Sequence, residues 1–375
     1  DADGNINTEN DWTGVNNWAI ELYSCLDGNY QNCIFSSTKQ TNPDGSYRFD
    51  NLIPGFYQIK EIVKSGWTFL KDTFINIFIG PGEEVSEQNF VNTRFVGITA
   101  CKIVDSDGDI STINDQIGYD GWGIDLYKNG NLIDSKTTGT NGCASWNDLM
   151  PGNDYHIMEE QSPIWTPLGP NSFNFIQVVS GGSYTGTFIN FENINISGYK
   201  FNDKDGNGNW DSGENGLEGW IINLNNGSTV VNTTTNANGF YEFTNLGPGN
   251  YTISESIKTS WIQTHPTNPN TYTIGAKSGI NENNLNFGNQ GRGSVTVLKN
   301  VDTDSDGIID QEGVTDWEWK LDNTTYTTGE TVNTAAGKYQ VQEIQKNDYH
   351  VVNLSCNRAD LGLVENTEIE LLPGE

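Results

Sequence analysis

The sequence predicts an all-β protein, a tandem array of four immunoglobulin-like or prealbumin-like antiparallel β-sandwich domains. A recurring tryptophan motif is the first observation behind this prediction. Val-Asn-Asn-Trp18-Ala-Ile-Glu-Leu-Tyr returns in variant form around Trp122, Trp220 and Trp317. The spacings of 104, 98 and 97 residues between these tryptophans indicate repeated domains rather than a solenoid of short units.

Short runs of alternating apolar residues are the second observation. Runs such as Tyr47-Arg-Phe49 are separated by turn sequences such as Asn238-Gly239, a pattern typical of strands. About seven short strands in roughly 95 residues favour a small antiparallel sandwich. The expected domains are residues 1–95, 96–195, 196–292 and 293–375.

The first and last repeats are expected to be incomplete sandwiches. Repeat 1 opens on its acidic loop with no first strand, and repeat 4 stops at Glu375 with no last strand. Either the sequence is cut from a longer array, or a neighbouring copy supplies the missing strands. The first explanation is favoured because strand donation needs a specific edge partner.

The charge balance excludes some classes of function. Forty-nine acidic residues against 19 basic ones give a net charge of −30 with no basic cluster, so a nucleic-acid partner is not expected. No apolar stretch is long enough to span a membrane. An enzyme is also not expected, because no nucleophile motif stands out and the three histidines, His156, His265 and His350, occupy unrelated positions.

Cysteines and sequons are consistent with an extracellular location. Cys25 and Cys33 flank a turn-rich segment, Cys101 and Cys143 share one repeat, and Cys356 is left over. Two disulfides are therefore expected in an oxidising compartment, with five reduced thiols as the alternative. Asn-x-Ser/Thr sequons permit glycosylation at Asn195, Asn226, Asn232, Asn250, Asn323 and Asn353.

An acidic loop precedes each tryptophan motif and suggests a Ca²⁺ site. Repeat 3 places oxygen side chains at positions 1, 3, 5, 9 and 12 of a loop with Gly208 at position 6, the spacing of an EF-hand-type loop. The flanking sequences are β-like, so a helix–loop–helix sensor is not expected. The alternative is an Asp/Asn/Gly turn that binds no metal. The candidate ligands are Asp1, Asp3, Asn5 and Asp11; Asp105, Asp107, Asp109 and Asp115; Asp203, Asp205, Asn207, Asn209, Asp211 and Glu214; and Asp302, Asp304, Asp306, Asp310 and Glu312.

Strand alternation also predicts that three polar residues per complete repeat face the core, although it leaves the facing of Lys200 open because Tyr199 and Phe201 flank it. They are a first-strand Lys, the Glu of a Tyr-x-Ile/Val-x-Glu strand, and an Asn of the closing Asn-Phe-x-Asn motif. A desolvated Lys becomes a nucleophile and a desolvated Glu holds a proton, so Lys and Asn in contact could condense to an isopeptide bond. A buried ion pair with a hydrogen-bonded Asn is the alternative. The candidates are Lys102, Glu159 and Asn193; Lys200, Glu255 and Asn289; Glu61 and Asn92; and Lys299 and Glu343.

The repeats resemble the SdrD B-like domain of serine-aspartate-repeat adhesins and the related Cna protein B-type (prealbumin-like) domain. Repeat 3 carries the resemblance most fully, through Gly198-Tyr-Lys-Phe-Asn-Asp203, Asn238-Gly-Phe-Tyr-Glu-Phe243 and Asn286-Phe-Gly-Asn289. The resemblance implies a Greek-key sandwich, calcium in the acidic loops and a stalk or fibre role. The Cna B type further implies a Lys–Asn isopeptide assisted by the Glu, whereas SdrD B-like repeats usually bind calcium without one.

The favoured function is therefore a non-enzymatic, calcium-stabilised stalk or filament subunit at a cell surface that assembles with other copies. An adhesin that binds a surface glycan or a host protein is the alternative. Trp67, Trp165 and Trp261 recur at one position per repeat. They are expected to pack in the core or at domain junctions rather than to form a binding platform.

Overall fold

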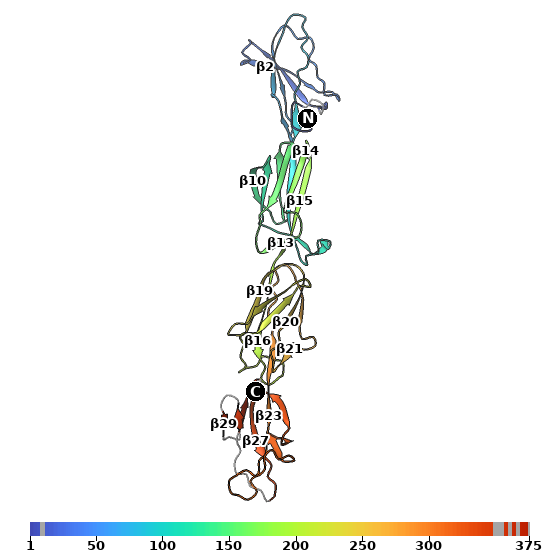
Figure 1. Cartoon of the computed structure of the whole chain (residues 1–375). Helices are drawn as coiled ribbons and strands as arrows, with labels where there is room; N and C mark the ends of the chain where they lie inside the picture. The colour runs from blue at the N-terminus through green and yellow to red at the C-terminus, as the bar shows by residue number, and fades with distance from the viewer. Residues whose placement is uncertain (8–11, 348–355, 359–361, 365–367, 374–375) are drawn as a thin grey trace. The chain divides into compact units, whose positions relative to one another are not determined.

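The computed structural model describes residues 1–7, 12–347, 356–358, 362–364 and 368–373. Almost all of its regular structure is β-strand, apart from a 3-10 turn at Ile113–Asp115, which confirms the all-β prediction. The chain divides into two compact units, residues 1–192 and 193–375. Each unit holds two of the repeats (Figure 1).

Repeat 1 has a four-stranded sheet in the order β2-β1-β3-β5 and a separate pair, β4 with β6. The sheet is antiparallel throughout. The strands are β1 (Ala19–Cys25), β2 (Cys33–Gln40), β3 (Gly55–Glu61), β4 (Trp67–Phe69), β5 (Phe74–Ile79) and β6 (Asn92–Arg94).

Repeat 2 has two complete sheets, β10-β9-β12-β14 and β11-β7-β15-β13, with β8 added beside β7. First strand β7 lies between β11 and last strand β15, and β7 and β15 run parallel. The strands are β7 (Val96–Asp105), β8 (Gln116–Gly118), β9 (Gly123–Lys128), β10 (Asn131–Thr137), β11 (Cys143–Leu149), β12 (Gly152–Glu159), β13 (Trp165–Pro167), β14 (Ser172–Val178) and β15 (Ser183–Glu192).

Repeat 3 repeats this plan with sheets β18-β17-β20-β22 and β19-β16-β23-β21. Its first and last strands, β16 and β23, again pair in parallel. The strands are β16 (Ile194–Asn202), β17 (Ile221–Asn225), β18 (Val230–Thr234), β19 (Phe240–Leu246), β20 (Asn250–Glu255), β21 (Trp261–His265), β22 (Tyr272–Gly275) and β23 (Phe287–Thr296).

Repeat 4 shares a strand with repeat 3. Strand β23 closes repeat 3 and continues without a break to pair with β26 of repeat 4, so the boundary predicted at residue 292 falls inside a strand. The remaining strands are β24 (Glu318–Leu321), β25 (Thr324–Thr327), β26 (Thr331–Ala335), β27 (Gly337–Glu343), β28 (Cys356–Arg358), β29 (Gly362–Val364) and β30 (Glu368–Leu371).

Alternation along the strands builds each core. In β9, Ile124 and Leu126 are buried between more exposed neighbours, and they pack with Ile98 and Trp146 of the opposite sheet. This is the period-2 pattern expected when one face of each sheet meets the other. The tryptophan that marks each repeat stands just before a central strand and is at most 7% exposed. The apolar positions of the sequence therefore decide which face of each sheet is inside.

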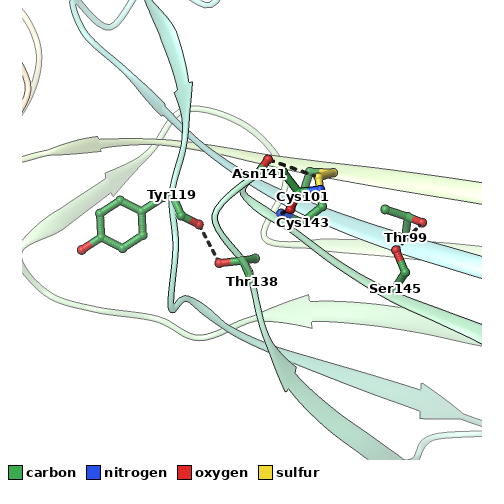
Figure 2. Close-up of a disulfide and its surroundings, with 7 residues drawn as sticks. All are labelled: Thr99, Cys101, Tyr119, Thr138, Asn141, Cys143 and Ser145. Carbon is green, nitrogen blue, oxygen red and sulfur yellow. Dashed lines mark hydrogen bonds between the residues drawn. A yellow bond between two sulfur atoms is a disulfide. The ribbon is translucent and has the colours of Figure 1, made fainter.

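A buried threonine anchors each of these tryptophans, a feature that the sequence reading missed. In repeat 2, the Thr138 Oγ1 accepts a hydrogen bond from the backbone N–H of Trp122 at 2.9 Å. It also donates one to the Tyr119 carbonyl at 2.6 Å (Figure 2). Because both partners are backbone groups, the threonine fastens the Tyr119–Trp122 segment to the end of β10, just beyond the last pair of the β9–β10 ladder. The equivalent residues are Thr41, Thr235 and Thr328.

Both expected disulfides are confirmed. Cys25 bonds Cys33, and Cys101 bonds Cys143 (Figure 2). In each case the two cysteines lie directly opposite one another on adjacent antiparallel strands. The first disulfide fastens the β1–β2 hairpin, and the second fastens β7 to β11, so the strand that carries Lys102 is held covalently on one side.

Replacing Thr138 by Val should destabilise repeat 2. The substitution keeps the shape of the side chain but leaves the buried Trp122 N–H and Tyr119 carbonyl without their partner, a change that costs about 1–3 kcal/mol. Urea unfolding followed by tryptophan fluorescence measures the loss. Thr137→Val is the control, since Thr137 is exposed on β10. Equal unfolding midpoints for the two variants would contradict the anchoring role.

Candidate functional site

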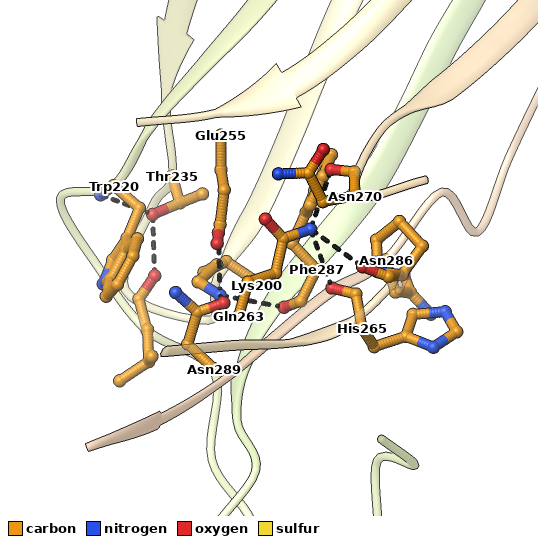
Figure 3. Close-up of polar contacts among 12 residues, drawn as sticks. Lys200, Trp220, Thr235, Glu255, Gln263, His265, Asn270, Asn286, Phe287 and Asn289 are labelled. Carbon is orange, nitrogen blue, oxygen red and sulfur yellow. Dashed lines mark hydrogen bonds and ion pairs between the residues drawn. The ribbon is translucent and has the colours of Figure 1, made fainter. Parts of the chain in front are cut away.

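Repeat 3 holds a Lys–Glu–Asn group in its core (Figure 3). The Lys200 Nζ lies 2.9 Å from the Glu255 Oε2 and donates hydrogen bonds to the Asn289 Oδ1 and, at 3.3 Å, to the Phe287 carbonyl. Lys200 and Asn289 are 0% exposed. The three residues come from β16, β20 and β23, so the group ties the first and last strands to the opposite sheet. Lys200, whose facing strand alternation leaves open because Tyr199 and Phe201 flank it, thus also points into the core.

Repeat 2 holds the equivalent group, but with a different asparagine from the one predicted. Lys102 pairs with the Glu159 Oε2, and the Asn190 Nδ2 donates to the same oxygen at 3.3 Å. Both charged side chains are 0% exposed. Asn193 was expected here, but its Nδ2 bonds the Asn245 Oδ1 at 2.8 Å in an exposed position. The prediction of Asn193 is therefore wrong, and Asn190 takes its place.

Strand register explains this correction. In the parallel first–last pairs, Lys102 stands opposite Phe188 and Lys200 opposite Phe287. The asparagine two residues after that phenylalanine faces the core, which gives Asn190 and Asn289. Repeat 2 contains two successive Phe-x-Asn triplets, at residues 188–190 and 191–193, and the Asn-Phe-x-Asn motif selects the second. Counting from the lysine finds the right residue, because Asn190 follows Lys102 by 88 residues and Asn289 follows Lys200 by 89.

Repeats 1 and 4 each show part of the group. In repeat 1 the Asn92 Nδ2 donates to the Glu61 Oε1 at 2.5 Å, and Glu61 is 4% exposed. In repeat 4 the Lys299 Nζ lies 2.7 Å from the Glu343 Oε1, with both side chains less than one-fifth exposed. These contacts bring together the residues predicted for the two repeats.

The repeated tryptophan forms one wall of the lysine site. The Lys102, Lys200 and Lys299 Nζ atoms lie 4.1, 4.4 and 4.5 Å from the ring centroids of the tryptophans in their own repeats. An indole face attracts a cation and excludes water. The carboxylate and the ring therefore hold each ammonium in place. The tryptophan that marks each of these repeats in the sequence thus serves to bind the buried lysine.

Burial perturbs the ionisation of these groups. Desolvation lowers the pKa of Lys200 from 10.5 to about 8, against the opposing influence of Glu255. It also lowers the pKa of Lys102 and raises the pKa of Glu255, although Lys200 opposes the latter shift. In repeat 1, burial raises the pKa of Glu61 despite the hydrogen bond from Asn92. The shifts favour a neutral amine and a protonated carboxyl, which are the states that nucleophilic attack and proton donation require.

The acidic loop of repeat 3 gathers oxygen atoms. Carboxylate oxygens of Asp203, Asp205 and Glu214 lie within 4.8 Å of one another. Asp203 is 0% exposed and accepts from the Gly206 N and the Gly208 N, each at 2.7 Å. Gly208 has φ +82°, a conformation that suits glycine at the turn where the sequence predicted one. The predicted ligands Asn207, Asn209 and Asp211 lie in the same exposed loop, where the Asn207 Nδ2 donates to carboxylate oxygens of Asp205 and Asp211.

The loops of repeats 2 and 4 have comparable triplets. In repeat 2, carboxylate oxygens of Asp105, Asp107 and Asp115 lie within 4.8 Å of one another. In repeat 4, those of Asp302, Asp304 and Asp306 do the same. Asp109 and Asp310 instead accept hydrogen bonds from Ser111 and Thr303, and exposed Glu312 is not in the triplet.

Repeat 1 is described only in part. Asp1, Asp3 and Asn5 accept hydrogen bonds from loop groups, but Asp11 lies outside the described residues. Hard oxygen donors of this kind are the ligand type that Ca²⁺ takes, and among the described residues the loops of repeats 2, 3 and 4 bring three carboxylates together.

Other predicted positions have simpler surroundings. Trp67, Trp165 and Trp261 pack edge-on against the motif tryptophans of their repeats, with ring centroids 5.1–5.4 Å apart, which favours internal packing over a binding platform. His156 stacks on Tyr127. The sequons at Asn226, Asn232, Asn250 and Asn323 are exposed and that at Asn195 is half-buried. His350, Asn353 and the side chain of Cys356 lie outside the described residues.

These features define a class: β-sandwich repeats joined in tandem, with buried Lys–Glu–Asn groups and acidic loops. Residues 194–287 match the family model of the SdrD B-like domain, so the resemblance read from the sequence is confirmed for repeat 3. Within the described residues no helix is long and apolar enough to cross a membrane.

Curated relatives extend the match over more of the chain. Serine-aspartate repeat-containing protein F of Staphylococcus epidermidis is 25% identical over 82% of this chain and 21% of its own length. Colossin-A of Dictyostelium discoideum is 25% identical over 87% of this chain and 3% of its own. Serine-aspartate repeat-containing protein D of Staphylococcus aureus is 27% identical over 51% and 15%. The chain thus spans about a fifth or less of these relatives, and the likeness supports an extracellular, cell-surface location.

Solved structures show only distant likeness. The Bacillus anthracis TIE protein aligns with 96% of this chain and 67% of its own, at 15% identity and a TM-score of 0.30. Shaft pilin SpaA from Lactobacillus rhamnosus GG aligns with 52% of this chain and 97% of its own, at 10% identity and a TM-score of 0.24.

Replacing Glu61 by Gln should stabilise repeat 1 at neutral pH. The folded pKa of Glu61 is raised above its ordinary 4.5, so the folded state binds more protons than the unfolded state and loses stability as pH rises through this window. Gln keeps an oxygen for Asn92 and removes the charge. We expect a higher Tm than wild type at pH 7 and no difference below about pH 4.5. Exposed Glu87→Gln is the control, and a lower Tm at pH 7 for Glu61→Gln would refute this view.

Proposed function

We propose that the chain is a calcium-stabilised structural segment, a stalk or filament subunit, of an extracellular surface protein, and that repeats 2 and 3 close by Lys–Asn isopeptide bonds. The contact of the Lys200 amine with the Asn289 carbonyl oxygen beside Glu255 carries the proposal. A nucleophile, an amide and a proton carrier meet there in a core without solvent access. The fold holds them in contact, which replaces the enzyme that amide exchange otherwise needs.

The bond-forming step needs no external reagent. The Lys200 ammonium gives a proton to the Glu255 carboxylate, and the neutral amine attacks the Asn289 Cγ. Glu255 then gives its proton to the Nδ2 as the C–N bond breaks and ammonia leaves, and its carboxylate takes the extra proton from the former amine nitrogen, which becomes the secondary amide N–H. Reactants and products balance as one amine and one primary amide giving one secondary amide and ammonia. The raised pKa of Glu255 and lowered pKa of Lys200 both favour the first transfer.

Repeat 2 is arranged differently for the same step. Glu159 accepts from both Lys102 and Asn190, so the carboxyl lies between nucleophile and amide. Its second oxygen and the Asn190 Oδ1 have no hydrogen-bond partner among the described residues. Rotation of the amide would bring its carbon towards the amine, and we expect the bond to form more slowly than in repeat 3.

Calcium would take its ligands from the acidic loops. In repeat 3, Asp203, Asp205 and Glu214 would hold the ion with help from other oxygens of the loop. In repeats 2 and 3 the first aspartate of the loop follows the buried lysine by three residues, Asp105 after Lys102 and Asp203 after Lys200. An ion there would neutralise carboxylates that otherwise repel one another, and would fix the end of the first strand.

Intact mass spectrometry tests the crosslink. The purified chain should weigh two ammonia molecules less than its sequence with both disulfides formed. Lys200→Arg and Lys102→Arg should each raise the measured mass by one ammonia, apart from the mass of the substitution itself. Glu255→Gln should slow the loss of ammonia in repeat 3 by at least about 100-fold, the usual contribution of a general acid–base. Lys258→Arg is the control, as the Lys258 Nζ lies 5.0 Å from the centroid of the same Trp220 ring. A wild-type mass equal to the uncrosslinked value would disprove the bond.

Chelation tests the metal. At free Ca²⁺ about 100 times Kd, each bound ion should add about 2.7 kcal/mol to the stability of its repeat, and chelator should remove it. Glu214→Gln should abolish this gain for repeat 3, whereas Glu218→Gln, the same charge change outside the close triplet, should keep it. Differential scanning calorimetry with and without Ca²⁺ gives the answer. Unchanged melting on chelation would rule out a structural metal.

A further inference from the structure

Strand β5 of repeat 1 is an unusually apolar sheet edge. It is the last strand of its sheet, bonded to β3 on one side and to no other described strand. Its outward side chains include Phe74 and Phe78, which are 49% and 53% exposed. The Phe78 ring lies 4.9 Å from that of Phe56 on the neighbouring strand. Exposed apolar surface on an unpaired edge is a site for strand addition.

Two other sheet edges carry protection that β5 lacks, although edge strand β14 shares its lack of charge and its regular ladder. The opposite edge of the same sheet, β2, contains Lys39 and a bulge. In repeat 2, edge strand β10 contains Asp134, Lys136 and a bulge. Charges and bulges are the usual means of preventing edge-to-edge pairing. Strand β5 has neither, because its ladder with β3 is regular and residues 73–82 include no charged residue.

The sequence of β5 is self-complementary. Phe74-Ile75-Asn76-Ile77-Phe78 reads the same in both directions. Antiparallel pairing about Asn76 with the same strand of another molecule places Phe74 opposite the partner's Phe78, Ile75 opposite the partner's Ile77, and Asn76 opposite the partner's Asn76. Directly opposite residues share a face of the sheet, so phenylalanines meet outside and isoleucines meet inside.

From this we infer that β5 joins two copies of the chain, edge to edge, across a two-fold axis through Asn76. The result is one eight-stranded sheet built from the two four-stranded sheets of repeat 1. A two-fold interface requires a surface that complements itself, and a palindromic strand meets that requirement where an arbitrary partner strand would not. The copies repel overall because each carries a charge of −30, but the local edge is neutral. This inference goes beyond the proposed function and does not depend on calcium or the crosslink.

A cysteine trap at the axis tests the pairing. In a Cys356→Ser background, Asn76→Cys places two thiols opposite each other, about 5 Å apart at Cβ, so mild oxidation should give a disulfide-linked dimer. Asn174→Cys is the matched control, because Asn174 stands at the equivalent position of edge strand β14 in repeat 2. Both variants use unglycosylated protein. Comparable crosslinking of the two variants at the same concentration would overturn the inference.

Sedimentation velocity gives an independent test. Wild-type chain should dimerise with increasing concentration, and Phe78→Lys should weaken the dimer at least tenfold by placing a charge in the interface. Ile176→Lys makes the same kind of change at an exposed residue of β14 and should leave the dimer unaffected. A chain that stays monomeric at all concentrations, or a dimer insensitive to Phe78→Lys, would show that β5 does not pair with itself.

Discussion

The burial of a lysine ammonium between an indole face and a glutamate is the interaction on which the architecture of repeats 2 and 3 depends. A charge in an apolar core is tolerated only with a partner, and here the partners come from different elements: the lysine from the first strand, the glutamate from a central strand and the tryptophan from the segment before another. A sandwich that misplaced any of the three would leave an unpaired charge inside. The pair therefore specifies how the two sheets meet, whether or not the lysine goes on to react.

The acidic loops adjoin this interaction directly. The Asp203 N–H donates to the Asn289 carbonyl at 2.9 Å, so the residue that begins the loop is bonded to the residue that completes the buried group. The carboxylates of the acidic loop and the buried lysine are thus separated by only a few residues of the first strand. A loop held by an ion and a core held by a lysine would then support the same pair of strands from two directions.

Much of the fold and of the buried site could be predicted from the sequence because the same residue types recur at the same structural positions in each repeat. Periodic Trp, Tyr-x-Ile/Val-x-Glu and Asp/Asn/Gly segments identified the sandwiches, the inward glutamates and the loops, and the positions of the cysteines identified both disulfides. Asn190 was missed because two Phe-x-Asn triplets stand side by side and only the register against Lys102 separates them. The buried threonines were missed because a lone Thr in a Thr-rich chain gives no signal until its backbone partners are known. The shared strand β23 was missed for a similar reason, as a boundary without a linker leaves no compositional mark.

The parallel pairing of first and last strands has a mechanical consequence. In repeats 2 and 3 the strands at which the chain enters and leaves lie side by side, β7 with β15 and β16 with β23. A force drawing the two ends of such a repeat apart slides these strands past each other, so their hydrogen bonds are loaded in shear and must fail together. Strands peeled open from one end would instead lose their bonds singly and at lower force.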